Sequence, residues 1–432
     1  MTSVVILAVG GVGAWIYQDL NNNINSADVD DKLGGDRPEN LSPGSKNILV
    51  VGSDSREGAN AKYGNKKDLT TMQSDTLMVL HVPADRKWAA VVSFPRDSWV
   101  KIPACDMGNG KTSSPHKGKI NEAFAIGGTS GEVAGAAACS IKTVEAHTGL
   151  RIDHFMSVDF SGFKGMVDAL GGIEVCPEQA INSDKARLKM KAGCQNVDGE
   201  TALGYVRVRY GVGDGSDIGR IGRQQEFMNA LVKKAKEKLT SPNALYGFLQ
   251  SATKSLTTDP DMAGIQPITA LANELKGIPS ERLAFLTVPN YPREADVPTD
   301  LANVVWQYPQ AANLFTSLAK DKEMTKAQLQ TAVKDLVYAS QVRVQVLNGT
   351  GVSGRAAAVA EKLRAAGFTV AGTGNAPETV TKTAVTFPAG MEKQAAVLSS
   401  RLPEARSAAS ADAAAGVVTL VVGPDLKVEQ LD

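Results

Sequence analysis

The sequence predicts a three-layer α/β/α domain with a mixed central sheet, followed by a small C-terminal α/β domain. Three apolar, β-branched runs follow one another closely, at residues 47–51, 76–82 and 88–94. Because each run is apolar on both faces, it is typical of a strand buried between two helix layers. Helix and strand patterns alternate after these runs, and a second alternation begins near Gln341.

Local signals place the other elements of the larger domain. Residues 130–147 are rich in alanine and begin with Ser130 as a candidate N-cap, which favours a helix. The apolar residues of a helix pattern at 220–239 gather on one face. We expect this domain to cover residues 46–325. Its other strand patterns lie at 153–158, 173–175 and 203–210, and its other helix patterns lie at 160–170 and 310–338.

The C-terminal domain is expected at residues 340–425. Gly349, Gly351 and Gly354 match the Gly-x-Gly-x-x-Gly pattern of dinucleotide sites, but no acidic residue closes the next strand. We therefore interpret these glycines as a tight turn before a helix. An alanine- and serine-rich stretch at 405–415 is expected to form a helix or a mobile loop. Strand patterns lie at 342–347, 369–370 and 417–422, and a helix pattern lies at 355–366.

The 432 residues carry no net charge, because 46 lysines and arginines are balanced by 46 aspartates and glutamates. General nucleic-acid binders usually carry a basic excess, so this balance argues against that class of protein. A strongly basic site must therefore be a local concentration of charge.

The N-terminus is apolar from residue 4 to residue 17. A helix of this length reaches roughly 21 Å, which is short of the roughly 30 Å hydrocarbon core of a membrane. We interpret residues 1–20 as a membrane anchor, of which the outer part is present. The alternative is a short buried helix. Residues 21–45 are polar and rich in Asn, Asp, Gly and Pro, so we expect a flexible tether.

Four cysteines are present, and none of them forms a Cys-x-x-Cys pair, so a zinc site is not expected. An even number of cysteines behind an anchor predicts two disulfides in an oxidising compartment. Sequence order favours Cys105–Cys139 and Cys176–Cys194, although three connectivities are open. The alternative is four reduced, buried thiols in a cytoplasmic protein.

The main chemical signal is a cluster of arginines at residues 205–225. Arg207 and Arg209 alternate with valines, so a strand would direct both guanidinium groups from one face. Arg220 and Gln224 lie one turn apart at the start of the next helix, where backbone N–H groups also favour anions. Planar guanidinium groups fit phosphate oxygens, so the pattern predicts a site for adjacent phosphates. The alternative is a solvated basic surface.

A second group of polar residues lies at the ends of the first three strands. Asp54 follows the first strand, Asp75 precedes the second, and Arg96 and Asp97 follow the third. Ligands of α/β sheets bind at such strand ends. Two carboxylates suit Mg²⁺, which proteins usually hold with one or two carboxylates plus phosphates and waters. Taken alone, Asp54 is equally consistent with a turn.

These blocks resemble the LytR–CpsA–Psr wall-polymer ligases over residues 47–230, and they occur in the family's order. The C-terminal domain resembles the LytR C-terminal domain that actinobacterial members often carry. The blocks are 47–56, 74–76, 94–97, 119–121, 159–163 with 170–172, and the arginine cluster ending at Gln225.

The resemblance implies a single-pass membrane protein whose catalytic domain lies outside the cell. Such enzymes move a glycopolymer from a polyprenyl-pyrophosphate carrier to peptidoglycan, through a phosphodiester. The implied partners are the carrier-linked glycan, peptidoglycan and the membrane, with no nucleic acid. An arabinogalactan-like polymer fits by analogy only.

The resemblance also assigns roles to individual residues. Asp54 and Asp75 look like ligands of Mg²⁺ or Mn²⁺, and Asp217 looks like the acid that orients the arginines. The residues that look like pyrophosphate ligands are Arg56, Arg96, Arg207, Arg209, Arg220, Arg223 and Gln224. The implied catalytic set is Asp54, Asp75, Arg96, Arg207, Arg209 and Asp217.

The family's polyprenyl tail lies in an apolar tunnel between sheet and helices. Plain core packing is the alternative for each residue that could line it here. One departure from the family pattern is Gln73, which stands where an arginine is common and could weaken pyrophosphate binding. The candidate tunnel residues are Phe155, Phe160, Phe163, Met166 and Met228.

Phosphoryl transfer requires positioning and electrostatic stabilisation more than covalent chemistry by the protein. No Gly-x-Ser-x-Gly motif supplies a nucleophile, so attack by an acceptor hydroxyl is the simplest mechanism. Asp75 and Asp97 are candidates for the general base. Two alternatives stay open: a pyrophosphohydrolase that uses water, and a non-catalytic protein that binds lipid precursors or scaffolds wall synthesis.

Overall fold

The computed structural model describes residues 15–53, 72, 74–108, 110–184, 186–208, 217–238, 242–334, 336–402 and 405–426. The chain forms two compact units. The second unit includes residues 288–325, which the sequence pattern groups with the larger domain. The first unit comprises Met1–Arg96, Ile102–Pro115 and Ile120–Thr287, and the second comprises Asp97–Lys101, His116–Lys119 and Val288–Asp432.

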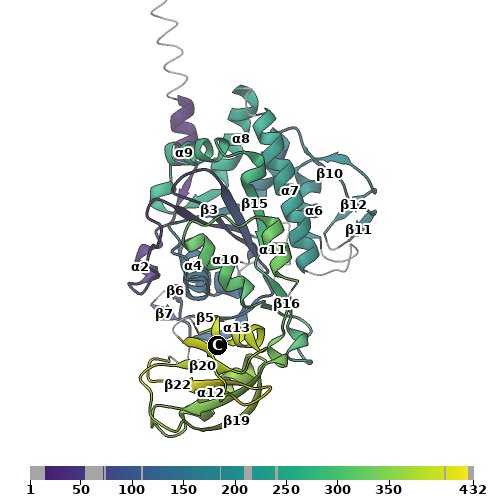
Figure 1. Ribbon diagram of the computed structural model, residues 1–432. Helices are drawn as coiled ribbons and strands as arrows, with labels where there is room; N and C mark the ends of the chain where they lie inside the picture. The colour runs from purple at the N-terminus through teal and green to yellow at the C-terminus, as the bar shows by residue number, and fades with distance from the viewer. Residues whose placement is uncertain are drawn as a thin grey trace, which may run out of the picture. The chain divides into compact units, whose positions relative to one another are not determined.

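A seven-stranded mixed sheet forms the centre of the first unit (Figure 1). Its strands in chain order are β1 (Asn25–Ser26), β2 (Lys46–Ser53), β3 (Ser74–Val82), β4 (Ala89–Phe94), β9 (His154–Asp159), β14 (Leu256–Thr258) and β15 (Leu283–Thr287). Their order across the sheet is β1-β14-β9-β2-β3-β4-β15. Strand β2 is parallel to β9 and antiparallel to β3, and β4 is antiparallel to β3 and parallel to β15.

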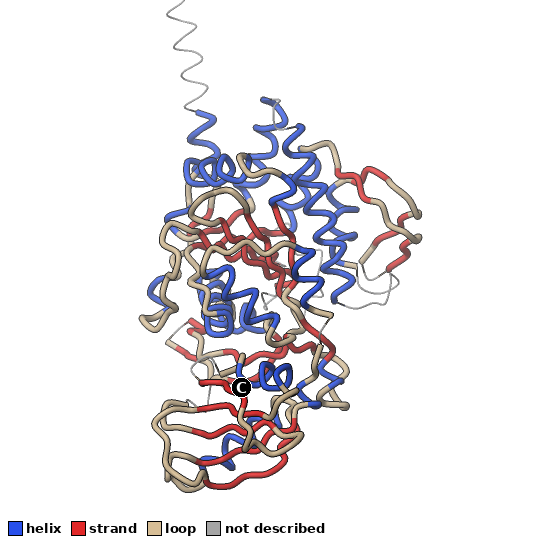
Figure 2. The backbone as a smooth tube through the Cα atoms, viewed as in Figure 1, coloured by secondary structure: helices blue, strands red, loops and turns tan. Residues whose placement is uncertain are grey.

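The three apolar runs form β2, β3 and β4, which confirms the prediction of buried central strands. Ile48 and Leu49 are adjacent in β2, so they point to opposite faces, and both are fully buried. On the face of Ile48, the sheet packs against Leu271 and its neighbours in a helix at Ile265–Lys276. Figure 2 shows the strands of the sheet enclosed by helices. The mixed α/β fold therefore agrees with the sequence prediction.

A helix at residues 15–22 precedes β1, and the other helices of the first unit lie between these strands in the sequence. The α-helices are α2 (Asp30–Leu33), α3 (Glu122–Gly127), α4 (Val133–Thr148), α5 (Phe160–Ala169), α6 (Gly199–Arg207), α7 (Asp217–Lys238), α8 (Pro242–Lys254) and α9 (Ile265–Lys276), and the 3₁₀ turns are η3 (Pro260–Met262) and η4 (Ser280–Arg282). Three two-stranded antiparallel sheets also belong to the unit: β6 (Asp106–Gly108) with β7 (Lys111–Thr112), β10 (Ile173–Val175) with β13 (Gln195–Val197), and β11 (Ile181–Ser183) with β12 (Leu188–Met190).

One element was predicted wrongly, because residues 203–207 belong to helix α6 and not to a strand. The side chain of Asp198 caps this helix by accepting a hydrogen bond from the Thr201 N–H at 2.9 Å. Ala202 and Tyr205 lie one turn apart and are both buried, which gives the helix an apolar face. The alternation of valines and arginines begins only in the last turn of α6, so it does not indicate a strand there.

The segment expected to be a flexible tether instead packs against the first unit. Strand β1 pairs with β14 at the edge of the central sheet. The Arg37 guanidinium contacts the Glu145 carboxylate at 2.6 Å, and these side chains are only 11% and 4% exposed. Lys32 forms a second ion pair, with Asp106 at 2.8 Å. Residues 24–45 thus contribute to the folded unit.

Most of the apolar N-terminal run lies outside the described residues, which begin at Trp15. Within the described part of the chain, no helix combines the length and the apolar character that crossing a membrane requires. The anchor therefore remains a prediction from the sequence.

Both disulfides of the structure lie in the first unit and follow sequence order. Cys105 is bonded to Cys139 with an S–S distance of 2.01 Å, and Cys176 is bonded to Cys194 at 2.06 Å. The first disulfide joins the segment before β6 to the middle of α4. The second joins the residue after β10 to the residue before β13, and the segment that it closes carries β11 and β12.

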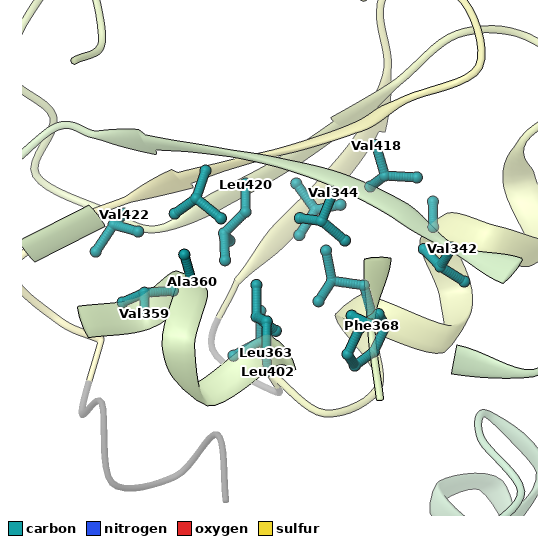
Figure 3. Packing of buried hydrophobic residues seen from close by; sticks show 14 of the residues in the cluster. Val342, Val344, Val359, Ala360, Leu363, Phe368, Leu402, Val418, Leu420 and Val422 are labelled. Carbon is teal, nitrogen blue, oxygen red and sulfur yellow. The ribbon is translucent and has the colours of Figure 1, made fainter. Parts of the chain in front are cut away.

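The second unit contains a five-stranded sheet of its own. Its strands are β18 (Arg343–Asn348), β19 (Thr369–Asn375), β20 (Ala384–Phe387), β21 (Arg406–Ala409) and β22 (Val418–Val422), and they lie in the order β19-β18-β22-β20-β21. Figure 3 shows Val359, Ala360 and Leu363 facing the sheet residues Leu420 and Val422. The other elements are β5 (Trp99–Ile102), β8 (His116–Lys119), β16 (Asn290–Pro292), η5 (Arg293–Ala295), β17 (Val304–Trp306), α10 (Gln310–Ala319), α11 (Lys326–Ala332), η6 (Ala339–Gln341), α12 (Arg355–Ala365) and α13 (Glu392–Ser399).

Two predictions for this unit need correction. The alanine- and serine-rich stretch contains strand β21, which is parallel to β20, and not a helix. The helix pattern at 310–338 is divided into α10 and α11. The glycine motif after β18 forms a turn, in which the Asn348 side chain accepts from the Thr350 N–H at 3.0 Å and donates to the Val352 carbonyl at 2.8 Å. Helix α12 begins after Gly354, whose φ is 79°.

Candidate functional site

The candidate site lies at one edge of the central sheet. Strands β2, β4, β9 and β15 end at this edge, and the antiparallel strand β3 begins there. Polar residues of distant parts of the chain therefore meet at the edge, namely Asp75 at the start of β3 and Arg96 just after β4. These residues lie close together because β3 runs antiparallel to β2 and β4, so that the start of β3 lies beside the ends of its neighbours.

Asp75 is the centre of the site. One oxygen of its carboxylate contacts Arg96 at 2.7 Å and Arg220 at 4.0 Å, and the other contacts Arg207 Nε at 3.4 Å. The structure thus brings four predicted site residues together around one carboxylate. Only 19% of the Asp75 side chain is exposed, so these charges interact with little screening by solvent.

The arginines decide the protonation state of Asp75. Burial by itself raises the pKa of this carboxyl group, but the charges of Arg207, Arg220 and Arg96 outweigh burial and hold the pKa below its ordinary value. Asp75 is therefore ionised at neutral pH. A carboxylate with a lowered pKa is a weak base, so Asp75 is better suited to orienting the arginines than to accepting a proton.

Each arginine reaches Asp75 from a different element. Arg96 follows β4, Arg207 is the last residue of α6, and Arg220 lies in the first turn of α7. Arg220 is only 2% exposed, and Arg207 and Arg96 are partly exposed, at 30% and 23% of their side chains. The sequence pattern predicts a strand at Arg207. In the structure, Arg207 lies at the end of helix α6 and Arg220 lies at the start of helix α7.

Arg207 also stacks on an aromatic ring. Its guanidinium carbon lies 4.4 Å from the centroid of the Phe160 ring, within the range of a cation–π interaction. Phe160 is the first residue of α5 and is buried. The ring and the Asp75 carboxylate fix the guanidinium from two sides, which limits the orientations that Arg207 can adopt.

The polar residues of α7 connect the site to neighbouring elements. Gln224 Nε2 donates to the Val206 carbonyl at 3.0 Å and lies 3.3 Å from Thr76 Oγ1, so it joins α7 to α6 and β3. Arg223 donates to the carbonyl of Val208, the residue that ends α6. Arg223 is therefore engaged with the backbone, whereas the family resemblance assigns it to pyrophosphate.

Gln225 was assigned no role from the sequence, although it lies at the same edge. Its amide donates to Thr287 Oγ1, at the end of β15, at a distance of 2.9 Å. Gln225 is 8% exposed, so this hydrogen bond is largely shielded from water. Its position beside Gln224 is the sequence feature that could have indicated a role in the site. Its contact with a strand more than sixty residues away cannot be predicted from sequence spacing.

Asp54, Arg56, Gln73 and Arg209 lie outside the described residues, and only the backbone of Asp217 is described, within α7. No group of three metal-ligating side chains gathers in the described part of the chain. The assignments of Asp54 to the metal and of Arg56 and Arg209 to pyrophosphate therefore rest on the sequence alone.

The candidate tunnel residues are divided between different parts of the first unit. Phe155 is fully buried in β9, and Phe160 lies beneath Arg207. Phe163 packs in the cluster around α5 and α7, where its ring centroid is 5.3 Å from that of Phe227. Met166 and Met228 are half-buried. Phe160 thus contacts the arginine cluster through Arg207.

Asp97, the second candidate for the general base, belongs to the second unit. Its carboxylate contacts the Lys119 ammonium group at 2.7 Å, and both residues lie in that unit. Asp97 is 5% exposed, so a buried ion pair holds it. This pairing favours a structural role for the two residues.

Two protein-family models match the chain. The LytR_cpsA_psr family matches residues 16–323, and the LytR cell envelope-related transcriptional attenuator family matches residues 341–426.

Curated proteins with similar sequences include two from Corynebacterium glutamicum and one from Enterococcus faecalis. The cell wall biosynthesis protein LcpA of Corynebacterium glutamicum is 30% identical over 410 residues, which cover 87% of this chain and 76% of LcpA. The probable cell wall biosynthesis protein LcpB of the same organism is 34% identical over 281 residues, 63% of this chain and 60% of LcpB. The match thus spans less than two thirds of LcpB. The polyisoprenyl-teichoic acid–peptidoglycan teichoic acid transferase TagU of Enterococcus faecalis is 30% identical over 257 residues, 59% of this chain and 75% of TagU.

A solved structure shares the fold. The LytR-Csp2A-Psr enzyme from Actinomyces oris superposes with a TM-score of 0.50 at 17% identity, covering 68% of this chain and 96% of that one.

Proposed function

This chain belongs to the LytR_cpsA_psr family, and from that premise we propose that it is a transferase that moves a glycopolymer from a polyprenyl-pyrophosphate carrier to peptidoglycan. The observation that carries the proposal is the junction of Arg96, Arg207 and Arg220 at one carboxylate. The name of a relative also supports the proposal, since TagU is a polyisoprenyl-teichoic acid–peptidoglycan teichoic acid transferase.

The arginine cluster suits a pyrophosphate for a physical reason. Guanidinium groups donate to phosphate oxygens in pairs, and three groups from three elements can surround two adjacent phosphates. The Asp75 carboxylate keeps them together before the substrate arrives, because it offsets part of their mutual repulsion. Preorganised positive charge of this kind stabilises the negative charge that develops in phosphoryl transfer.

In the proposed reaction, an acceptor hydroxyl of peptidoglycan attacks the phosphorus atom next to the glycan. A new P–O bond forms to the acceptor, and the P–O bond to the polyprenyl phosphate breaks. The glycan is then joined to the acceptor by a phosphodiester, and polyprenyl monophosphate leaves. The proton of the acceptor hydroxyl passes to the leaving phosphate or to solvent. The arginines hold the phosphates and stabilise the leaving group. Phe160, beneath Arg207, would begin the path of the polyprenyl tail.

A divalent cation, Mg²⁺ or Mn²⁺, is part of the proposal. Asp75 fits the role chemically, because its lowered pKa keeps it an ionised oxygen donor. Its oxygens already contact arginines, so the cation would need further ligands from Asp54 and from the phosphates of the substrate. When bound, it would polarise a phosphoryl oxygen. We expect metal binding to the chain to be weak without a pyrophosphate ligand and to strengthen in its presence.

We also propose that the chain is anchored in the membrane with its catalytic unit outside the cell. Two disulfides in the first unit support an oxidising compartment, because disulfides seldom persist in a reducing cytoplasm. An accessibility test on intact cells, in which an added protease reaches the first unit only if it lies outside, distinguishes the two locations.

The fate of the glycan tests the function. The purified chain is incubated with a polyprenyl-pyrophosphate-linked glycan, Mg²⁺ and peptidoglycan, and both the lipid and the glycan are followed. We expect polyprenyl monophosphate and peptidoglycan-attached glycan in equal amounts. Lipid release without attachment would indicate a pyrophosphohydrolase instead. Retention of intact lipid without turnover would indicate a binding protein.

A further inference from the structure

A polar cavity of about 520 Å³ lies in the first unit, at the same edge of the sheet as Asp75. One wall is the sheet, where Ser157 of β9 and Thr257 of β14 are register partners. The start of α4 and the N-terminal strand β1 form other walls. This volume lies within the usual range of roughly 300–1,000 Å³ for small-molecule sites.

The side chains on one face of the sheet change from apolar to polar where the strands reach the cavity. Residues two apart in a strand share a face, so Phe155, Ser157 and Asp159 of β9 point the same way. Phe155 is fully buried in the core, whereas Ser157 and Asp159 line the cavity. In β2, Val51 is likewise fully buried and Ser53 lines the cavity. Along both strands, apolar side chains of the core thus give way to polar side chains where the strands reach the cavity.

Ser157 provides an independent indication of a ligand. It is 5% exposed, and no described residue hydrogen-bonds its hydroxyl group, which faces the cavity. Polar groups inside proteins are normally hydrogen-bonded to protein, water or ligand. The Ser157 hydroxyl group therefore has its available partners in the cavity, as water or as a group of a bound ligand.

Helix α4 adds backbone donors to the same wall. Its N-cap residue Glu132 makes no side-chain hydrogen bond to the first turn, and Glu132, Val133 and Ala134 all line the cavity. The N–H groups of a first helical turn have no partner within the helix. Together with the hydroxyl groups of the sheet, they offer donors and acceptors at several points around one space.

The chemistry of the lining argues against both a phosphate group and a lipid chain as the ligand. Asp159 and Glu132 would repel a phosphate group, and an isoprenoid chain would leave the hydroxyl groups of the wall without partners. A sugar satisfies both conditions, because its hydroxyl groups both donate and accept hydrogen bonds and carry no charge. The carboxylate of Asp159 can accept from such hydroxyl groups while its other oxygen caps α5 through Gly162.

The cavity lies next to the arginine cluster. Asp159 is the register partner of Ser53, and Ser53 is the register partner of Ser74, the residue before Asp75. Neighbouring strands are about 4.8 Å apart, so the cavity begins one to two strands from the phosphate site. A sugar bonded to a phosphate that the arginines around Asp75 hold is within reach of this wall.

We propose that the cavity binds a sugar unit of the transferase substrate, through Ser157, Thr257 and the start of α4. This inference rests on the proposed transferase function. The sugar comes either from the carrier-linked glycan or from the acceptor peptidoglycan, and both sources share the hydroxyl chemistry that the cavity recognises.

Kinetics of three variants test the inference and identify the source. Ser157→Ala and Thr257→Val remove hydroxyl groups from the cavity, and Thr143→Val removes an equally buried hydroxyl group of α4 that bonds the Cys139 carbonyl outside the cavity. We expect the two cavity variants to raise one KM at least about tenfold with a smaller change in kcat, and Thr143→Val to leave both unchanged. A raised KM for the lipid-linked donor assigns the cavity to the carrier glycan. A raised KM for peptidoglycan assigns it to the acceptor.

A binding measurement separates this inference from the proposed function. Two phosphate-free probes are titrated into the wild-type chain and the Ser157→Ala variant by calorimetry: the GlcNAc–MurNAc disaccharide of peptidoglycan, and the oligosaccharide of the donor without lipid. We expect one probe to bind the wild type and to lose at least about tenfold in affinity with the variant, even if the chain proves not to transfer glycan. If neither probe binds and neither KM changes, the cavity holds only water and the inference is overturned.

Discussion

At the scale of the residue, Asp75 organises the candidate site. Its carboxylate is mostly buried and contacts three guanidinium groups that belong to separate elements. Burial favours the neutral acid and the arginines favour the carboxylate, and the arginines prevail. The residue that the sequence suggested as a metal ligand or a general base is therefore, in this geometry, first of all the counter-ion of the arginines.

The lowered pKa of Asp75 has a consequence for stability. Because the pKa in the folded chain lies below the ordinary value of 3.8, the carboxylate contributes stability above that value and loses it as pH falls through the folded pKa. We expect the free energy of unfolding to drop less for Asp75→Asn than for the wild type between about pH 5 and pH 3. Urea titrations across this range provide the measurement.

The exposed residue Asp85 supplies the matched control for this prediction. Asp85→Asn should lose stability with falling pH in parallel with the wild type. Equal pH dependence of the wild type and Asp75→Asn would show that the arginines do not stabilise the Asp75 carboxylate.

At the scale of the element, the two glutamines of α7 have separable roles. Gln224 joins α7 to α6 and β3 beside the arginines, and Gln225 joins α7 to the end of β15. We expect Gln224→Ala to lower turnover at least about tenfold, because it releases the ends of the helices that carry Arg207 and Arg220. Gln225→Ala should cost about 1 kcal/mol of unfolding free energy through its lost hydrogen bond, with a smaller effect on turnover.

The two glutamine variants control for one another, since they remove the same group from adjacent positions of one helix. Turnover and urea unfolding are measured on both. A larger loss of turnover in Gln225→Ala than in Gln224→Ala would contradict the positions given to them in the site.

The N-terminal segment is held by a buried ion pair, whose loss leaves a charge without its partner. The side chains of Arg37 and Glu145 are 11% and 4% exposed. We expect Arg37→Ala to lower the unfolding free energy by about 3–5 kcal/mol, because the Glu145 carboxylate stays buried. Lys32 pairs with Asp106 at a more exposed place, so Lys32→Ala should cost less than about 1 kcal/mol. Equal losses in the two variants would argue that the segment is only loosely attached.

Comparison of sequence and structure shows which elements local patterns can predict. Strands β2, β3 and β4 were predicted because residues apolar on both faces leave few alternatives. Helix α6 was missed because its last turn alternates like a strand, whereas its Asp198 cap and its buried face lie earlier. The packing of residues 24–45 was missed because a polar composition predicts solvation, and the partners Glu145 and Asp106 are distant in sequence.

The same distinction applies to the site. Asp75, Arg96, Arg207 and Arg220 were grouped from motifs and from a family resemblance, and the structure brings them together. The contact between Gln225 and Thr287 and the stacking of Arg207 on Phe160 depend on tertiary packing. No spacing rule encodes such contacts, so they could not be predicted from the sequence.

At the scale of the whole molecule, both disulfides lie in the first unit, while the second unit rests on its own apolar core. The two disulfides close 34 and 18 residues, and loops of this size are worth about 4 and about 3 kcal/mol in the chain-entropy account. We expect reduction to destabilise the first unit and to leave the second unchanged. Hydrogen exchange of β2 and β18 peptides, with and without reductant, reports the two units separately. Faster exchange in β18 after reduction would show that the units do not unfold independently.

The central claim is that the arginines around Asp75 carry the transfer of a glycopolymer. The most direct test is the rate at which Arg207→Ala attaches glycan to peptidoglycan, compared with the wild type and with Arg364→Ala, which removes an exposed arginine of α12. We predict that Arg207→Ala loses at least about 100-fold in rate while keeping the wild-type circular dichroism spectrum, and that Arg364→Ala is unaffected. A folded Arg207→Ala variant that transfers glycan at the wild-type rate would contradict the account.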